Sequence, residues 1–101
     1  MERYKIILSK QARIDLKDIA YFIANTYKAP ETARRYAAGI VKEISELSKY
    51  AGSIQISEHK TILQYGHNAR RVNFKKTTII YTIHSKTVLV EKIMISSLIT
   101  E

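Results

Sequence analysis

The stretch RRVNFKKTTIIYTIHSKTVLVEKIMI, residues 70–95, decides the fold of this chain. Together with the preceding alanine it contains three runs rich in β-branched residues: ARRVNF, TTIIYTIH and KTVLVEKIMI. Runs of this composition predict β-strands. The polar pairs KK and SK separate them, and breaks this short predict antiparallel hairpins rather than crossovers. The last third of the chain is therefore predicted to be a three-stranded meander.

Two amphipathic helices are predicted upstream of the meander, over residues 10–26 and 30–50. Apolar side chains in the first recur at spacings of three and four residues and form one stripe: Ala12, Leu16, Ile19, Ala20 and Ile23. Ser9 suits the N-cap, because its hydroxyl can accept a hydrogen bond from a free backbone N–H of the next turn. Pro30 suits the first position of the second helix. The short turn between the helices predicts an antiparallel helical hairpin.

The remaining segments complete the order of elements. Residues 4–8, YKIIL, alternate as a short strand does, and residues 51–67 are less regular, with SIQIS predicting a short strand or an extended strap. The predicted fold is α+β with the order β-α-α-β-β-β, in which the helical hairpin packs on one face of an antiparallel sheet and makes a two-layer domain. Within the second helix, Gly39 predicts close packing against the first helix.

Composition limits the kinds of site. The chain has 101 residues and is predicted to form a single domain, residues 1–101. It has no cysteine, which excludes disulfides and thiolate chemistry. The three histidines, His59, His67 and His84, do not have metal-ligand spacing, so we expect neither a metal nor another cofactor. No apolar run approaches the roughly 18 residues of a membrane span, and the N-terminus does not resemble a signal peptide, so we expect a cytoplasmic protein without a membrane partner.

Charge is the strongest indication of a partner. The net charge is +8, and no acidic residue lies between Glu58 and Glu91, whereas six Lys or Arg do. Such a field favours association with nucleic acid or an acidic protein surface, although a solvated basic face is an equal alternative. We take the following as candidate partner-binding residues: Arg70, Arg71, Asn73, Lys75 and Lys76. If Val72 and Phe74 face the helices, strand alternation places Arg70 near the rim of the core and Arg71, Asn73 and Lys75 outward.

Smaller features have ordinary interpretations. Tyr81 alternates with Ile79 and Ile83 on a central strand, which favours a place in the core over a catalytic role. Asp15 and Asp18 lie nearly one turn apart off the apolar stripe of their helix, and we expect both carboxylates to be solvated.

Three stretches carry a family resemblance. LSKQARIDLKDIAYFIANTY (residues 8–27), PETARRYAAGIVKEISEL (residues 30–47) and residues 70–95 resemble the RelE/ParE toxin superfamily of bacterial type II toxin–antitoxin systems. The length of the helical hairpin is similar to the ParE branch. That resemblance implies a toxin that binds and inhibits DNA gyrase and is held inactive by a cognate antitoxin. We expect the antitoxin to lay an extended or helical segment along an exposed apolar surface.

The RelE branch offers an alternative, metal-independent cleavage of mRNA on the ribosome. Such cleavage needs cations for the phosphorane charge and groups for proton transfer. The candidates here are Arg70, Arg71, Lys75, Tyr81 and His84. Two departures weigh against it: residues 77–79 lack the arginine that RelE-type ribonucleases usually carry before the strand tyrosine, and the tail SSLITE contains no base or cation. We therefore expect binding rather than catalysis, and an inactive member that only binds its antitoxin is a third possibility.

Overall fold

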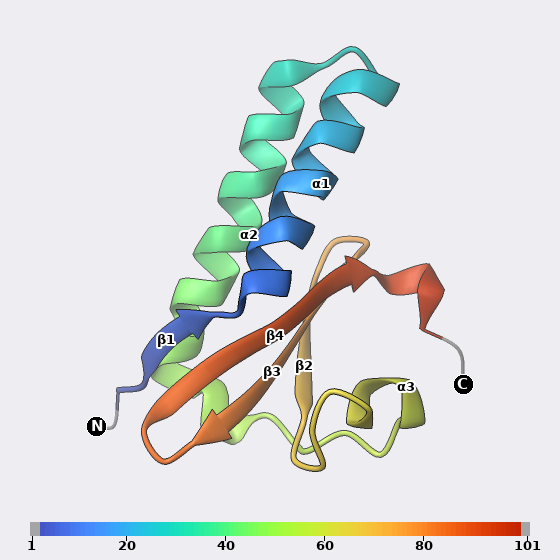
Figure 1. Ribbon diagram of the computed structural model, residues 1–101. Coiled ribbons are helices and arrows are strands. Elements are labelled where there is room, and N and C mark those ends of the chain that lie inside the picture. The colour runs from blue at the N-terminus through green and yellow to red at the C-terminus, as the bar shows by residue number, and fades with distance from the viewer. Residues whose placement is uncertain (1–2, 100–101) are drawn as a thin grey trace.

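The computed structural model describes residues 3–99 of the chain (Figure 1). The elements follow the predicted order, and both long helices have the predicted bounds. They are β1 (Lys5–Leu8), α1 (Lys10–Thr26), α2 (Pro30–Tyr50), a 3-10 turn (Ala51–Ser53), α3 (Lys60–Leu63), β2 (Arg70–Phe74), β3 (Thr77–His84), β4 (Thr87–Ile95) and a second 3-10 turn (Ser96–Leu98).

The sheet has the strand order β1-β4-β3-β2. Strands β2, β3 and β4 form the predicted antiparallel meander, with Lys75 and Ser85 in left-handed conformation at its two tight turns. Strand β1, however, pairs in parallel with β4, from Lys5 opposite Thr87 to Leu8 opposite Val90. The sheet is therefore mixed, and the expectation of an all-antiparallel sheet is wrong for this strand. A four-residue strand about eighty residues from its partner carries no local indication of its direction.

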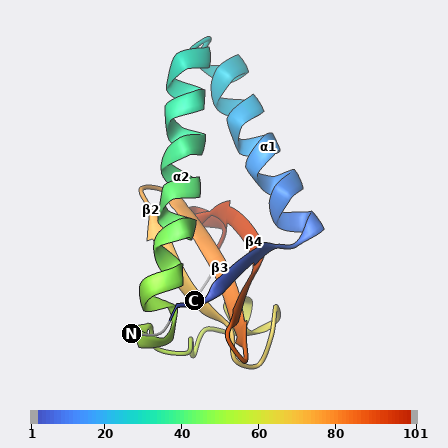
Figure 2. The same cartoon turned by 90° about the vertical axis from the view of Figure 1, so that its left-hand side faces the viewer.

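The two long helices cover one face of the sheet (Figure 2). Their apolar stripes meet the inward residues of the strands in one core, to which α2 contributes Ile40, Ile44 and Leu47 and β3 contributes Ile79 and Tyr81. All five are buried, so the prediction that Tyr81 belongs to the core is confirmed. The part of each predicted stripe that is nearest the sheet thus faces it as expected: Ala12 and Leu16 of α1, and Ile40, Ile44 and Leu47 of α2.

The opposite face of the sheet is partly covered by the segment that contains α3. Ile62 of this helix packs with Ala69 and Ile80 in a second, smaller apolar cluster. Met94 and Ile99 border the same cluster. Helix α3 was not predicted from the sequence, because its four residues are too few to show a periodicity.

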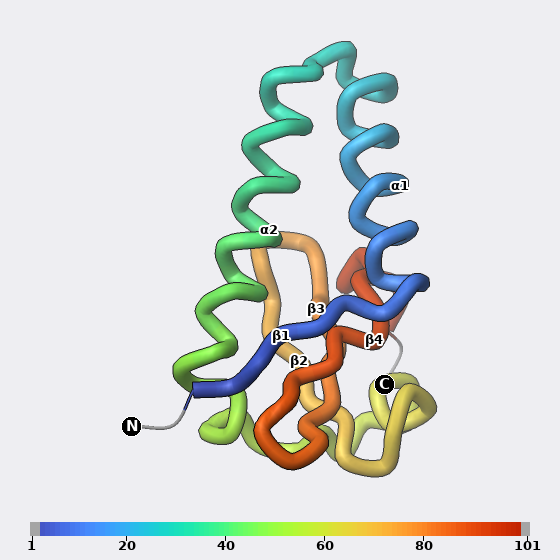
Figure 3. Tube along the Cα trace, turned by 60° about the vertical axis from the view of Figure 1, so that its left-hand side comes forward, coloured from blue at the N-terminus to red at the C-terminus, as the bar shows by residue number. Residues whose placement is uncertain are grey.

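The helical hairpin extends past the sheet. In Figures 1 and 3 the turn between α1 and α2 stands well clear of the strands, and only the first part of α1 runs beside β4. The free part of the hairpin and the end of the sheet below it form the walls of the site described next.

Candidate functional site

A groove of about 750 Å³ lies between the helical hairpin and the end of the sheet. Helix α1 contributes Ile19, Phe22 and Ile23, α2 contributes Tyr36, and the end of β4 contributes Ile95. The lining is predominantly apolar. Apolar concavities are the usual places where proteins receive ligands or partner segments, which makes this groove the candidate site.

Aromatic side chains stand exposed at the edge of the groove. Phe22 is 52% exposed and Tyr27 is 68% exposed, and their rings meet edge to face with centroids 6.5 Å apart. Large apolar side chains grouped on a surface mark sites where another molecule packs. The groove therefore has the properties of a protein-docking surface.

Lys75 and Lys76 add positive charge beside this apolar surface. Lys76 lines the groove. The Nζ of Lys75 lies 5.8 Å from the ring centroid of Tyr36 and 5.6 Å from that of Phe74, within range of a cation–π interaction. We expected Lys75 to face away from the helices, and this is wrong. Its left-handed backbone, φ 53°, breaks strand alternation at the turn and lets the side chain reach the helix side.

Arg70 and Tyr81 meet at one acceptor beneath the C-terminal end of α2. The Ala51 carbonyl oxygen accepts from Arg70 Nη1 at 3.1 Å and from the Tyr81 hydroxyl at 2.8 Å. Burial raises the pKa of Tyr81 to about 12, while the guanidinium of Arg70 acts in the opposite direction and Tyr4 adds to the rise. Arg70 thus lies at the rim of the core, as its phase with Val72 predicted. At neutral pH Tyr81 is a protonated hydrogen-bond donor inside the core.

Arg71 and Asn73 lie on the opposite face of the sheet. Arg71 is paired with Ile80 and Asn73 with Thr78, and these positions alternate with those that face the helices. The Asn73 Oδ1 accepts from the Thr78 hydroxyl at 2.8 Å, and that hydroxyl also contacts Ser96 Oγ at 2.8 Å. Asn73 is therefore already engaged in a small polar network.

His84 ends β3. Its Nε2 lies 2.8 Å from the hydroxyl of Thr82, which in turn donates to Glu91 Oε2 at 2.9 Å. The five residues considered for RNA cleavage are consequently spread over two faces of the sheet and both ends of β3. Of these five, Arg70 and Tyr81 share a hydrogen-bond acceptor, the carbonyl oxygen of Ala51.

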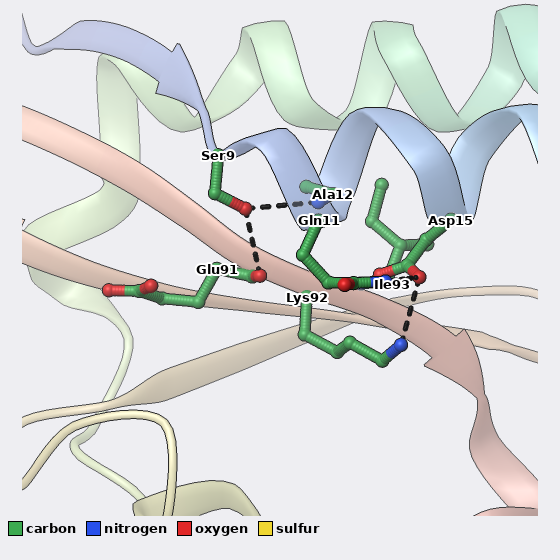
Figure 4. Close-up of polar contacts among 7 residues, drawn as sticks. All are labelled: Ser9, Gln11, Ala12, Asp15, Glu91, Lys92 and Ile93. Atoms are coloured by element: carbon green, nitrogen blue, oxygen red, sulfur yellow. Dashed lines mark hydrogen bonds and ion pairs between the residues drawn. The ribbon is translucent and has the colours of Figure 1, made fainter.

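Asp15 of α1, beside the groove, was expected to be solvated, and this is also wrong. The residue is buried, only 6% exposed. Its Oδ1 accepts from Lys92 Nζ and from Gln11 Nε2, both at 2.8 Å, and its Oδ2 accepts from the backbone N–H of Ile93 at 3.0 Å (Figure 4). An indication was present in the sequence, because Asp15 follows Ala12 by three residues and so lies on the same side of the helix.

Residues 3–99 lack two other kinds of site or segment. Within that range no three or more His, Asp or Glu side chains are arranged to hold a metal ion. No helix in the same range is long and apolar enough to cross a membrane.

Comparison with known proteins identifies the family. Residues 6–97 match the family described as the ParE toxin of the type II toxin–antitoxin system parDE. The chain belongs to the ParE toxin family. No curated protein matches the sequence.

Two solved structures have the same fold. One is the chromosomal ParDE toxin–antitoxin system from P. aeruginosa, with a TM-score of 0.73 and 16% identity over 92% of this chain and 96% of that one. The other is the toxin–antitoxin complex RelBE2 from Mycobacterium tuberculosis, with a TM-score of 0.63 and 18% identity over 92% of this chain and 98% of that one. The predicted RelE/ParE resemblance and α+β fold are thus confirmed, and this ParE-family chain is the toxin component of a type II system.

Proposed function

We propose that this ParE-family toxin acts in the cytoplasm by binding DNA gyrase and inhibiting it, and that it does not cut RNA. The first half of this proposal rests on membership of the ParE family, and the second half rests on the position of Tyr81. Its hydroxyl is buried, already donates to Ala51, and has a raised pKa. Proton transfer at a scissile phosphate requires a group that can reach the substrate, and this hydroxyl would have to leave the core to do so.

The other candidates for cleavage support the same proposal. Arg71 is on the face opposite Tyr81, and the Lys75 ammonium lies over two aromatic rings. Cations that stabilise a phosphorane must converge on one point. A binding toxin has no such requirement, and its exposed apolar and basic surfaces are sufficient for function.

We further propose that the cognate antitoxin docks in the groove. Phe22, Tyr27 and Ile95 offer an apolar surface, and Lys76 and Asp18 also line the groove. Lys75 adds a second positive charge beside Tyr36. An amphipathic segment with large apolar residues on one side and acidic residues at its edge matches both features. A second copy of this toxin is a poorer occupant, because each copy carries a net charge of +8.

The groove suits a helical segment in size. One turn of an α-helix with its side chains fills roughly 420–610 Å³, given a diameter of about 10–12 Å and a pitch of 5.4 Å. The groove, at about 750 Å³, is of the same order as one such turn. On the opposite face of the sheet, Arg71 is available to an extended continuation of the same antitoxin.

Two assays with the purified toxin test the target. Gyrase supercoiling of relaxed plasmid should slow, or cleaved DNA complexes should accumulate, as toxin is added, and preincubation with the antitoxin should reverse the effect. Messenger RNA translated on ribosomes should stay intact under the same conditions. RNA cleavage that disappears in a Tyr81→Phe variant would instead establish the ribonuclease alternative. Growth arrest with neither response would show that the target is a different one.

A further inference from the structure

We propose that Asp15 is a positioning residue that sets the width of the groove by fixing the angle at which α1 leaves the edge of β4. The inference rests on the proposed use of the groove for docking the antitoxin. It goes beyond that proposal by assigning the shape of the groove to a buried side chain that does not line it.

The edge of β4 is covered first by β1 and then by the start of α1. Strand β1 covers this edge only as far as Val90. Beyond that point the start of α1 takes over: the backbone N–H of Ser9 donates to the Val90 carbonyl at 2.9 Å, and the Ser9 hydroxyl donates to the Glu91 carbonyl at 2.9 Å. The Asp15 carboxylate then accepts from the N–H of Ile93 (Figure 4). Ser9, the N-cap of α1, and Asp15 within α1 thus take the place of a neighbouring strand along β4.

The carboxylate of Asp15 provides directional hydrogen bonds at a buried position. Burying a charge is costly, and apolar replacements for a buried ion pair are often as stable as the pair itself. Stability alone therefore does not account for Asp15 and Lys92. A carboxylate held by the Gln11 amide, the Lys92 ammonium and the Ile93 N–H is fixed in direction as well as in depth. Apolar contacts are not directional in this way.

The contacts of Asp15 with Gln11, Lys92 and Ile93 lie at the base of the groove. Ile19 and Phe22 follow Asp15 by four and seven residues, so they continue the same side of α1, and both line the groove. On the sheet side, Ile95 follows Ile93 by two residues, so it points to the same face, and it also lines the groove. Asp15 and its partners therefore join the two walls at their common base.

A small change in the tilt of α1 at Asp15 moves the far end of the helix by a larger distance. The part of α1 from Asp15 to Thr26 is roughly 16 Å long at 1.5 Å per residue. A tilt of about 10° at Asp15 would move the far end of the helix by about 3 Å. A gap of less than 1 Å already loses a quarter to a half of a van der Waals contact. Loss of the directional anchor should consequently spoil the fit of the groove while the core below it remains packed.

A distance measurement between two spin labels tests, without any binding partner, whether Asp15 fixes the angle of α1 relative to the sheet. The chain has no cysteine, so labels can be attached to Asn25→Cys on α1 and Lys86→Cys on the β3–β4 turn, both exposed positions. In the otherwise native chain we expect a narrow distance distribution. In an Asp15→Leu/Lys92→Met background we expect a cooperative melt but a broader distribution. The matched control is Glu46→Leu/Lys49→Met, which removes a surface ion pair of α2 and should leave the distribution narrow.

A binding measurement completes the test. The probe is a synthetic peptide that covers the C-terminal segment of the cognate antitoxin. If the docking-competent arrangement falls to about one tenth of the molecules, the apparent affinity falls about tenfold. We expect that loss in the Asp15→Leu/Lys92→Met variant and none in the Glu46→Leu/Lys49→Met control.

The outcomes are distinguishable. A variant that keeps both the narrow distribution and full affinity would overturn the role of Asp15. A wild-type protein that does not bind the peptide would overturn the proposed docking site, and the label distances would still decide the role of Asp15. If the double variant does not fold, Asp15→Ala decides in its place, because it removes the acceptor of the Ile93 N–H: a broader distribution with a cooperative melt supports the proposal, and an unchanged distribution refutes it.

Discussion

Gly39 in the middle of α2 lies directly against the ring of Phe74 at the end of β2. A Cβ atom added at Gly39 would overlap the ring carbons of Phe74. Glycine inside a helix costs about 1 kcal/mol relative to alanine, and here that cost is offset by the close approach of helix and strand. The same ring packs on Tyr36, with centroids 5.3 Å apart, so the contact also holds one wall of the groove.

Replacing Gly39 with alanine should therefore destabilise the protein, although the same change in an exposed helix would stabilise it. We expect a loss of about 2 kcal/mol in the free energy of unfolding, which is typical of an overpacked core, as measured by urea denaturation. The double variant Gly39→Ala/Phe74→Leu should recover part of that loss, because leucine removes the ring that the new methyl group meets. If Gly39→Ala is at least as stable as the wild type, the close contact is not a constraint.

Gly39 also shows what the sequence can and cannot predict about this fold. A glycine in a helix correctly indicated a close approach, but the predicted neighbour was α1 and the actual neighbour is β2. Local signals such as Ser9 and Pro30 gave the helix bounds, because caps act within one turn. The parallel pairing of β1 depends on contacts between distant residues, which no local pattern contains.

At the candidate site, too, local patterns were predictive and contacts between distant residues were not. Alternation along β2 correctly separated Arg70 from Arg71, because side chains on a strand have a period of two. It failed at Lys75, where a left-handed turn residue interrupts the strand. The groove itself was not foreseen, because it is formed by the part of a helical hairpin that extends past the sheet, and the relative lengths of such layers follow from packing.

The Ser9 hydroxyl makes two hydrogen bonds that should be measurable together. It caps α1 by accepting from the Ala12 N–H at 3.0 Å, and it donates to the Glu91 carbonyl at 2.9 Å. We expect Ser9→Ala to lower the free energy of unfolding by about 1–2 kcal/mol. The control is Ser45→Ala, which removes an exposed hydroxyl bonded only to the Lys42 carbonyl within α2. Equal losses in the two variants would contradict the double role of Ser9.

The hydroxyl of Tyr81 should matter for stability and not for toxicity. Tyr81→Phe loses the hydrogen bond to Ala51, whose carbonyl keeps the Arg70 guanidinium as a donor. We expect a loss of about 1 kcal/mol at neutral pH and growth arrest equal to that of the wild type when the toxin is expressed without antitoxin. A folded Tyr81→Phe protein that no longer arrests growth would argue for chemistry at this residue.

Alkaline pH should destabilise the wild type more than Tyr81→Phe. Burial raises the pKa of Tyr81 to about 12, above about 10 for an exposed tyrosine. The folded state therefore holds the phenol proton more tightly than the unfolded state. The contribution of this group to stability is complete below about pH 10 and is lost as the pH rises through about 12, where the loss amounts to about 2 kcal/mol. Urea denaturation at several pH values should show the extra decline in the wild type alone, and parallel profiles would refute the burial effect.

Reversing the charge at Lys76 should weaken antitoxin binding without unfolding the toxin. Lys76 is exposed and lines the groove, so glutamate there would place a negative charge beside the acidic edge of the proposed segment. We expect Lys76→Glu to raise the dissociation constant for the antitoxin about tenfold, or about 1.4 kcal/mol, in titration calorimetry, and the effect should shrink as salt is added. Lys86→Glu is the matched control, because it reverses an exposed lysine at the other end of β3 and should change the affinity little. If the two variants bind equally well, the groove does not select its partner by charge, and the apolar contacts of Phe22 and Tyr27 would have to supply the specificity.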